Sequence, residues 1–164
     1  MEIRHSTLLD LPELLKLYEV ARNFMKEQGN PHQWGDTGWP NEKYLKKDIM
    51  NGVHYVVLSN DEIVGAFSFS IGADPTYLII EDGNWLNDEP YGVIHKAASN
   101  QKCHGVMDAV YNYCSRQINN IRIDTHKDNK PMLNWIKKKG FTWCGHIYTG
   151  DGTIREAFQK IIKE

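Results

Sequence analysis

The sequence predicts a mixed α/β fold, in which a central mixed, twisted β-sheet of about six to seven strands is flanked by about four helices. Three features of the 164 residues support this class. The N-terminal third has helical hydrophobic spacing, the middle alternates apolar and polar residues, and the part after Tyr91 alternates between strand and helix patterns. One domain, residues 1–164, fits this length, and its β–α–β crossover should be parallel and right-handed.

Two helices are expected within the first 50 residues, after an initial strand. Asp10 and Glu13 form a capping pair, and Pro12 lies in the first turn, where its missing N–H costs nothing. Apolar residues then repeat at helical spacing until Gly29. A second, short helix covers residues 42–50 and ends before a turn.

A hairpin and a second set of strands and helices follow. The runs 54–59 and 62–71 alternate on either side of Asn60-Asp61, which predicts a β-hairpin. Residues 72–89 are rich in turn signals and predict a long, partly structured loop. Further strands are expected at 91–99, 120–126, 141–148 and 153–161, and helices at 106–114 and from Asn129 to Gly140. The order of elements is then β-α-α-β-β-β-α-β-α-β-β.

Composition excludes several classes of function. The net charge of −2 lacks the basic excess on which nucleic-acid binding usually depends. Cys103, Cys114 and Cys144 have no CxxC spacing, so neither a disulfide framework nor a metal site is expected. The charged start and the lack of a long apolar run indicate neither a signal peptide nor a membrane span. We therefore expect a soluble, cytoplasmic protein.

The turn at residues 102–107, between a predicted strand and a predicted helix, is the first candidate binding site. Backbone N–H groups at a helix N-terminus attract an anion, and Gly105 would let a phosphate approach closely. Lys102 would add a positive charge. An ordinary strand-to-helix turn is the alternative interpretation.

This turn, the strand NIRIDTH, Asn129 and the sequence KKKGF together resemble the GNAT superfamily of acyl-CoA-dependent N-acetyltransferases. The element order follows that family over nearly the whole chain. Where the family's phosphate turn reads Gln/Arg-x-x-Gly-x-Gly/Ala, this chain has Lys102, Gly105 and Met107. The resemblance implies a GNAT-like fold, an N-acetyltransferase domain over residues 1–164, acetyl-CoA as co-substrate and no metal.

The resemblance also implies where coenzyme A would lie. Its pantetheine amides would pair along the edge of the strand 91–99 as an added strand does, and two small residues of that strand would let the arm lie close. The pyrophosphate would lie over the backbone amides of the turn. The implied cofactor-binding residues are Ala97, Ala98, Lys102, Cys103, His104, Gly105, Val106, Met107 and Asn129.

Catalysis in the family is direct attack of an amine on the thioester. Deprotonating a lysine-like amine costs ~4.6 kcal/mol at pH 7, whereas protonating the thiolate matters by only ~2 kcal/mol, so the base matters more than the acid. Many members keep a Glu or His where this chain has Tyr91, and Tyr91 can order a water or donate a proton. His95, on the same strand face, and His126 are the candidate bases. The family's frequent tyrosine acid is replaced by Ile136.

The acceptor site is expected between the first two helices. Residues 29–40 contain Trp34, Asp36 and Trp39 among glycines, which indicates either a mobile cover over a small ligand or a loop stapled to the core. The acidic stretch 74–89, which has no Lys or Arg, would attract a cationic acceptor unless it is simply a solvated loop.

The leading hypothesis is an enzyme that transfers an acetyl group from acetyl-CoA to a primary amine of a small molecule or to a peptide amino terminus. The alternative is a catalytically quiet GNAT-fold protein that binds acyl-CoA or a small ligand as a sensor. The expected partners are thus a small-molecule amine or a peptide N-terminus, with no nucleic acid and no membrane. A homodimer stays open.

Overall fold

The computed structural model describes residues 1–163, and its central feature is a seven-stranded sheet of order β1-β2-β3-β4-β5-β7-β6. Neighbouring strands are antiparallel except β4 and β5, which are parallel. The predicted mixed sheet and parallel crossover are therefore confirmed. The strands are β1 (Glu2–His5), β2 (His54–Ser59), β3 (Glu62–Ile71), β4 (Gly92–Ser99), β5 (Asn120–Thr125), β6 (Thr142–Tyr148) and β7 (Ile154–Ile161).

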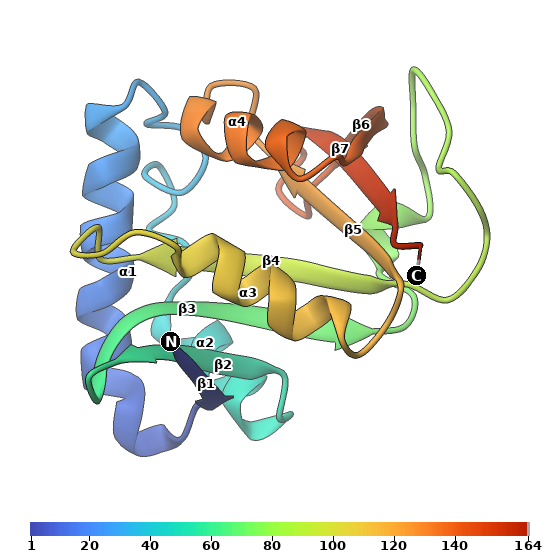
Figure 1. Ribbon diagram of the computed structural model, residues 1–164. Coiled ribbons are helices and arrows are strands. Elements are labelled where there is room, and N and C mark those ends of the chain that lie inside the picture. The colour runs from blue at the N-terminus through green and yellow to red at the C-terminus, as the bar shows by residue number, and fades with distance from the viewer. Residues whose placement is uncertain (164) are drawn as a thin grey trace.

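Helices cover both faces of the sheet (Figure 1). Apolar side chains of α3 and α4 pack with one face of the sheet, and those of α1 and α2 pack with the other face. A third, smaller core forms under the segment between β3 and β4. The helices are α1 (Leu11–Glu27), α2 (Glu42–Met50), α3 (Val106–Ser115) and α4 (Lys130–Lys138), and short 3₁₀ turns lie at Leu8–Asp10 and Pro75–Tyr77. No helix among residues 1–163 is long and apolar enough to cross a membrane.

Most local predictions are confirmed at nearly the predicted bounds. Asn60 and Asp61 both have positive φ, 50° and 65°, as a tight hairpin turn requires. The Asn129 side chain accepts a hydrogen bond from the Met132 N–H and so caps α4, and Gly140 follows that helix with φ 82°.

The predicted capping pair at the start of α1 is wrong. Asp10 is helical and does not cap α1 with its side chain. Its carboxylate instead accepts the Thr7 N–H, at 2.8 Å, and forms an ion pair with Arg4. The reason is that the preceding residues form a 3₁₀ turn with its own capping box, and Asp10 closes that box.

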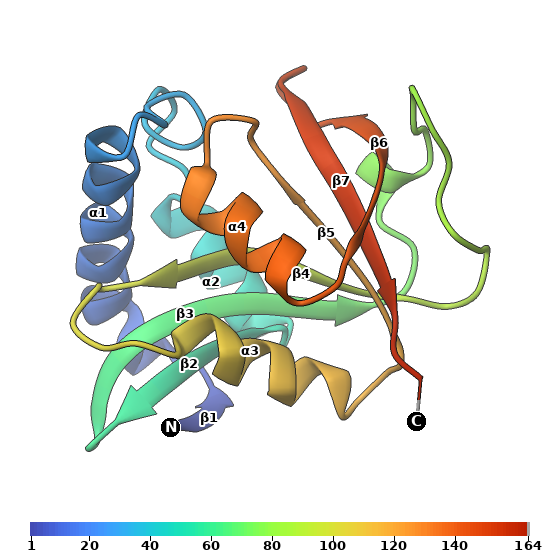
Figure 2. The ribbon, with the colours of Figure 1, turned by 45° about the horizontal axis from the view of Figure 1, so that its top comes forward.

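The sheet is split at its centre. β4 and β5 pair only at Gly92–Ile121 and Val93–Arg122, near the beginning of both strands. In Figures 1 and 2, β4 then runs on toward α1, while β5 turns away toward the start of α4. The second half of β4 therefore keeps one edge free of β5, and unpaired N–H and C=O groups on such an edge can bind an extended chain.

Candidate active site

A bulge at Lys96 shapes the free half of β4. Ser68 of β3 pairs with His95, whereas Ala66 pairs with Ala98, so β4 contains one extra residue between these pairs. Lys96 has φ 51°, which is rare for a residue with a side chain, so its contacts must compensate for the strain.

A buried chain of hydrogen bonds holds the Lys96 backbone. The Tyr18 hydroxyl of α1 donates to the Lys96 carbonyl at 2.7 Å and lies 3.0 Å from His54 Nε2, and His54 Nδ1 lies 2.6 Å from Ser6 Oγ. Because Tyr18 has one proton to give, His54 Nε2–H must donate to Tyr18 and Nδ1 must accept from Ser6. Burial lowers the pKa of His54 to about 4, so the imidazole is neutral at pH 7.

The Lys96 side chain is held separately. Its ammonium lies 2.8 Å from Asp48 Oδ2 of α2, and Ser68 Oγ donates to the same oxygen at 2.6 Å. The ammonium also lies 5.3 Å from the centre of the Trp39 ring. Lys96 therefore connects β4 to both α2 and the loop that precedes α2.

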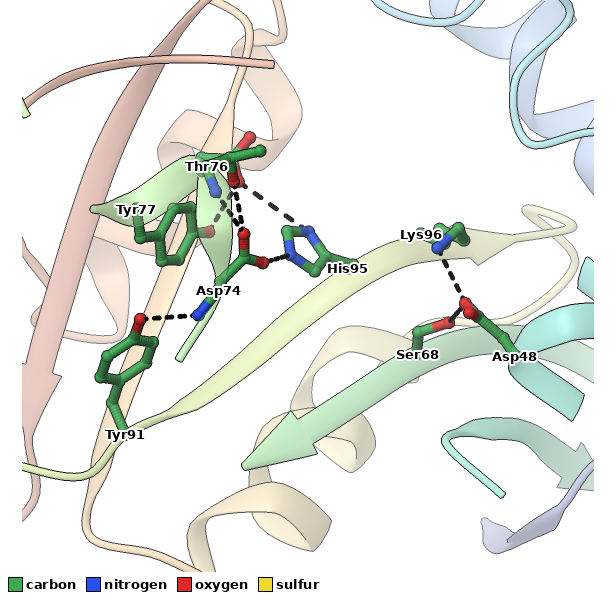
Figure 3. A network of polar contacts seen from close by, with 9 residues as sticks. Asp48, Ser68, Asp74, Thr76, Tyr77, Tyr91, His95 and Lys96 are labelled. Atoms are coloured by element: carbon green, nitrogen blue, oxygen red, sulfur yellow. Dashed lines mark hydrogen bonds and ion pairs between the residues drawn. The ribbon is translucent and has the colours of Figure 1, made fainter. Parts of the chain in front are cut away.

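His95, immediately before Lys96, lies between two carboxylates, of which Figure 3 labels Asp74. Its Nε2 is 2.7 Å from Asp74 Oδ2, and its Nδ1 is 3.9 Å from Asp124 Oδ2. Burial would raise the pKa of Asp74, but hydrogen bonds from His95 and Thr76 outweigh it and lower this pKa to about 2. Since Asp74 is ionised, the His95 Nε2–H donates to it, and neutral His95 has its free lone pair on Nδ1.

The second carboxylate, Asp124, is fixed by Tyr77. The Tyr77 hydroxyl donates to Asp124 Oδ2 at 2.6 Å. Burial, with the nearby charge of Asp124, raises the pKa of Tyr77 well above its ordinary value, so Tyr77 remains a donor.

Tyr91, a predicted catalytic residue, is buried one position before β4. Its hydroxyl accepts the backbone N–H of Asp74 at 2.9 Å, and the Arg122 guanidinium lies 3.8 Å from the centre of its ring. Figure 3 shows Asp74 between Tyr91 and His95. The structure therefore brings two of the predicted residues together through Asp74, a residue that the sequence interpretation treated only as part of an acidic turn.

His126, the third predicted residue, follows β5 and forms no direct hydrogen bond with His95. It is buried, and its Nδ1 accepts the backbone N–H of Asp128 at 3.1 Å. Burial first, and then the nearby charge of Arg155, lower the pKa of His126. His126 is therefore a neutral imidazole whose remaining proton is on Nε2.

The loop between α1 and α2 is fixed at Trp34. This side chain is buried in the core on the α1 face, with its ring 5.9 Å from Tyr18 in an edge-on arrangement. Trp39 is half-buried against the same core, whereas Asp36 is exposed and pairs with His32. Of the two alternatives for this loop, a mobile cover or a loop stapled to the core, the burial of Trp34 favours the second.

Most of the acidic segment 74–89 contacts the sheet rather than a cleft. Asp82 lies 2.7 Å from His146 Nδ1, and Glu81 accepts the Tyr148 hydroxyl at 3.1 Å, so both residues bind the segment to β6. Asp74 is the member that reaches His95.

The predicted phosphate turn lies at the N-terminus of α3. Gly105 is the N-cap residue at φ 89°, and no side chain among the described residues caps this helix. A Cβ built at Gly105 would have one neighbour within 4 Å, Met1 Cε at 4.0 Å, so the space above the turn is open. Lys102 and His104 are exposed, Val106 is buried, and Cys103 and Met107 pack against the α3 core.

These features fit a coenzyme A molecule. The free first-turn amides and the open glycine suit a pyrophosphate. The second half of β4, which includes Ala97 and Ala98, has a free edge on the β5 side, and this edge suits an extended arm with amides. Asn129 caps α4 and donates from Nδ2 to Gln33 Oε1 at 3.0 Å, so its side chain is already engaged. Ile136 is fully buried in the core, so that position supplies no acid.

Comparison with solved structures shows a likeness to acetyltransferases of the GNAT family. An acetyltransferase of the GNAT family from Streptococcus agalactiae matches with a TM-score of 0.88 and 27% sequence identity, covering 99% of this chain and 96% of that chain. The chain has the GNAT fold. A second GNAT-fold match, a putative acetyltransferase from Staphylococcus aureus, has a TM-score of 0.72 and 25% identity, covering 99% of this chain and all, 100%, of that chain.

More distant GNAT structures share the fold alone. Naa50 from Arabidopsis thaliana, in complex with the bisubstrate analogue CoA-Ac-MVNAL, has a TM-score of 0.57 and 18% identity over 97% of each chain. No family sequence profile and no curated protein matches the chain. The matches support acyl transfer as the class of activity.

Several residues of this candidate site have no local sequence signal. Asp74 reaches His95 across 21 positions, and Tyr18 reaches Lys96 across 78. In the sequence, His54 likewise looks like an ordinary strand residue and Tyr77 like an ordinary loop residue. Only the hairpin and crossover topology brings these side chains to the centre of the sheet.

Proposed function

We propose that this protein is an acetyl-CoA-dependent N-acetyltransferase that acts on the amine of a small molecule or on an amino terminus. The observation that carries the proposal is His95. Its Nε2–H donates to ionised Asp74, and the free lone pair of the neutral ring is then on Nδ1, in the part of β4 that no longer pairs with β5. The fit of the α3 turn to a pyrophosphate and the resemblance to GNAT acetyltransferases support it.

Three parts of the chain would hold the co-substrate. The amides of residues 103–107 and the Lys102 ammonium would bind the pyrophosphate, and the free edge of β4 would bind the arm. The chemistry that acetyl-CoA supplies is an activated acyl carbon with a thiolate leaving group. The contacts of Lys96 with Tyr18 and Asp48 keep the bulged backbone in one conformation, so its amides are pre-oriented.

His95 acts as the base in this proposal. The acceptor ammonium gives one proton to His95 Nδ1, and the resulting neutral amine nitrogen forms a bond to the acyl carbon. The carbon–sulfur bond breaks, and the second proton that the nitrogen loses passes to water. Asp74, oriented by Tyr91, and Asp124, oriented by Tyr77, stabilise the imidazolium that forms. The thiolate takes a proton from water, because Ile136 offers none, and His95 returns its proton to solvent.

The test measures release of free thiol from acetyl-CoA with a panel of amines, together with mass spectrometry of the products. His95→Gln should lower kcat by about 10²–10⁴-fold while coenzyme A affinity is retained. His5→Gln, a matched change on the exposed edge strand β1, should leave the rate unchanged. Near-native turnover of His95→Gln would refute the base assignment, and coenzyme A binding without turnover of any amine would favour the sensor.

A further inference from the structure

Arg155, on β7, is a buried guanidinium without a direct ion pair, and the carboxylates that act on it, Asp124 and Asp151, do so from a longer distance. It is 6% exposed, and within the described part of the chain no carboxylate oxygen lies within 4.0 Å of it. Its contacts are two backbone carbonyls, that of Gln33 at 3.1 Å from Nη2 and that of Ile154 at 3.4 Å from Nη1. Because burial of a charge is costly unless the charge is paired, this arrangement calls for an explanation.

The other buried arginine shows what a purely structural solution looks like. Arg122 lies between the rings of Trp85 and Tyr91, at 4.1 Å and 3.8 Å from their centres, and donates to the Asn87 carbonyl at 2.8 Å. Two aromatic faces replace the water that Arg122 loses. No aromatic ring is recorded over Arg155 within residues 1–163, so the same account does not apply to it.

Strand register places Arg155 on the face that carries His95. In the β5–β7 ladder Asp124 is opposite Ala157, so Arg155 is a diagonal neighbour of Asp124, on the same face at a typical separation of roughly 7–8 Å. The next position along this ladder would put His126 opposite Arg155. His95 reaches the same region from β4, since its Nδ1 lies 3.9 Å from Asp124.

Arg155 and His126 also retain donors that no protein group uses. Within the described residues, the completely buried side-chain nitrogen and oxygen atoms without a partner are Asn30 Oδ1 and Arg122 Nε. Arg155 Nε and His126 Nε2 also have no hydrogen-bond partner. They are not among the completely buried atoms, so both reach solvent. The site therefore combines a guanidinium and an imidazole N–H, which are suitable donors for a carboxylate.

We infer that Arg155, with His126, binds a carboxylate of the acceptor, so that the substrate is a small amino acid or a related amine with an acidic group a few bonds from the nitrogen. This inference rests on the proposed acetyltransferase function. The cationic amine lies toward His95 and the carboxylates of Asp74 and Asp124, and the carboxylate lies toward Arg155. Opposite charges at the two ends of the site orient the acceptor with its nitrogen at the base.

The inference separates acceptors that the general proposal treats alike. A peptide amino terminus has an amide, not a carboxylate, next to its first side chain, and a simple amine has neither. Both leave the guanidinium unpaired when they fill the site, which costs affinity. A free amino acid should therefore be the better acceptor.

The test compares amino acids with their decarboxylated amines and with short peptides, using thiol release from acetyl-CoA. In the native protein, kcat/KM should be about 10- to 100-fold higher for the amino acid of a matched pair, as expected for charge-assisted hydrogen bonds. Arg155→Gln should raise KM for the amino acid by a similar factor and leave the decarboxylated amine and acetyl-CoA nearly unaffected. Arg155→Lys, which keeps the charge, should recover part of the loss.

Two controls make the outcomes distinct. Arg116→Gln, the same change on the exposed surface after α3, should alter neither acceptor, and thermal unfolding with coenzyme A titration should show that Arg155→Gln folds and binds coenzyme A. Equal use of both members of every pair, or an equal loss for both in Arg155→Gln, would overturn the inference and leave the acetyltransferase proposal standing. Coenzyme A binding without transfer to any acceptor would overturn the proposed function itself.

Discussion

Acidification should destabilise the fold through His54. The imidazole is fully buried between Ser6 and Tyr18, and its burial lowers its pKa to about 4, whereas an unfolded histidine titrates near ~6.5. The unfolded chain therefore binds a proton that the folded chain does not, over the range between these values. The stabilisation is complete above pH ~6.5 and is lost as the pH falls toward 4.

The size of the effect follows from the pKa difference. A shift of ~2.5 units at ~1.36 kcal/mol each gives on the order of 3 kcal/mol in the free energy of unfolding. A small domain is stable by only ~5–15 kcal/mol, so this single proton matters. Asp74 does not interfere, because its pKa of about 2 places its own acid-dependent loss below pH ~4.

Urea unfolding between pH 7.5 and pH 4.5 would measure this loss. His54→Gln is the informative variant: its side chain is neutral at every pH, so its free energy of unfolding should fall by about 3 kcal/mol less than that of the native protein over this range. The variant is expected to be less stable at neutral pH as well, because Gln cannot reproduce both hydrogen bonds, so the comparison uses the pH slope. His126, whose pKa is also lowered, contributes equally to both proteins. Parallel slopes for the two proteins would refute the reasoning.

Three further substitutions test the phosphate turn and the β4 bulge. Gly105→Asp should abolish coenzyme A binding, because it places a side chain at φ 89° and a negative charge in the site, and unchanged affinity in calorimetry would exclude this site. Lys102→Ala should weaken the binding of coenzyme A by about 1 kcal/mol, with a smaller effect at high salt. A coenzyme A affinity that does not depend on salt would contradict a phosphate contact of Lys102. Tyr18→Phe should lower stability by about 1–3 kcal/mol, since the Lys96 carbonyl and His54 Nε2 lose their partner, and an unchanged thermal midpoint would contradict that role.

Local features of the fold were predictable because each depends on a few adjacent residues. The Asn60-Asp61 turn, the Asn129 cap and Gly140 after α4 are examples in which one residue type satisfies one backbone requirement. The error at Asp10 has the same origin. A carboxylate at this position can accept hydrogen bonds either from amides of the following helix or from those of the preceding 3₁₀ turn. Here it accepts from the preceding turn, at the Thr7 N–H.

The candidate site was only partly predictable, because its polar contacts join distant segments. Tyr91 was identified from the resemblance to the GNAT family and His95 from strand alternation relative to Tyr91, but Asp74, which connects them, is placed by the fold of the β3–β4 segment. Arg155 has no distinguishing neighbours in the sequence, and its partner Gln33 is 122 positions away. Which buried charge lacks a partner is a property of the packed sheet, and no pattern within a strand reveals it.

Two histidines then act in different ways on the acid side of the pH–rate profile. His95 must be unprotonated to accept the amine proton, so protonation removes the base directly. His54 acts on the Lys96 bulge through its hydrogen bond with Tyr18. The positive charge of Lys96 already lowers the pKa of His54, so protonation of His54 places a second positive charge in the same region. At temperatures well below unfolding, His54→Gln should therefore keep the decline of kcat in acid, because His95 is intact. His95→Gln should lose that decline together with most of its activity. If His54→Gln alone lost the decline of kcat in acid, that decline would come from the Lys96 bulge, and the role of His95 as the base would have to be abandoned.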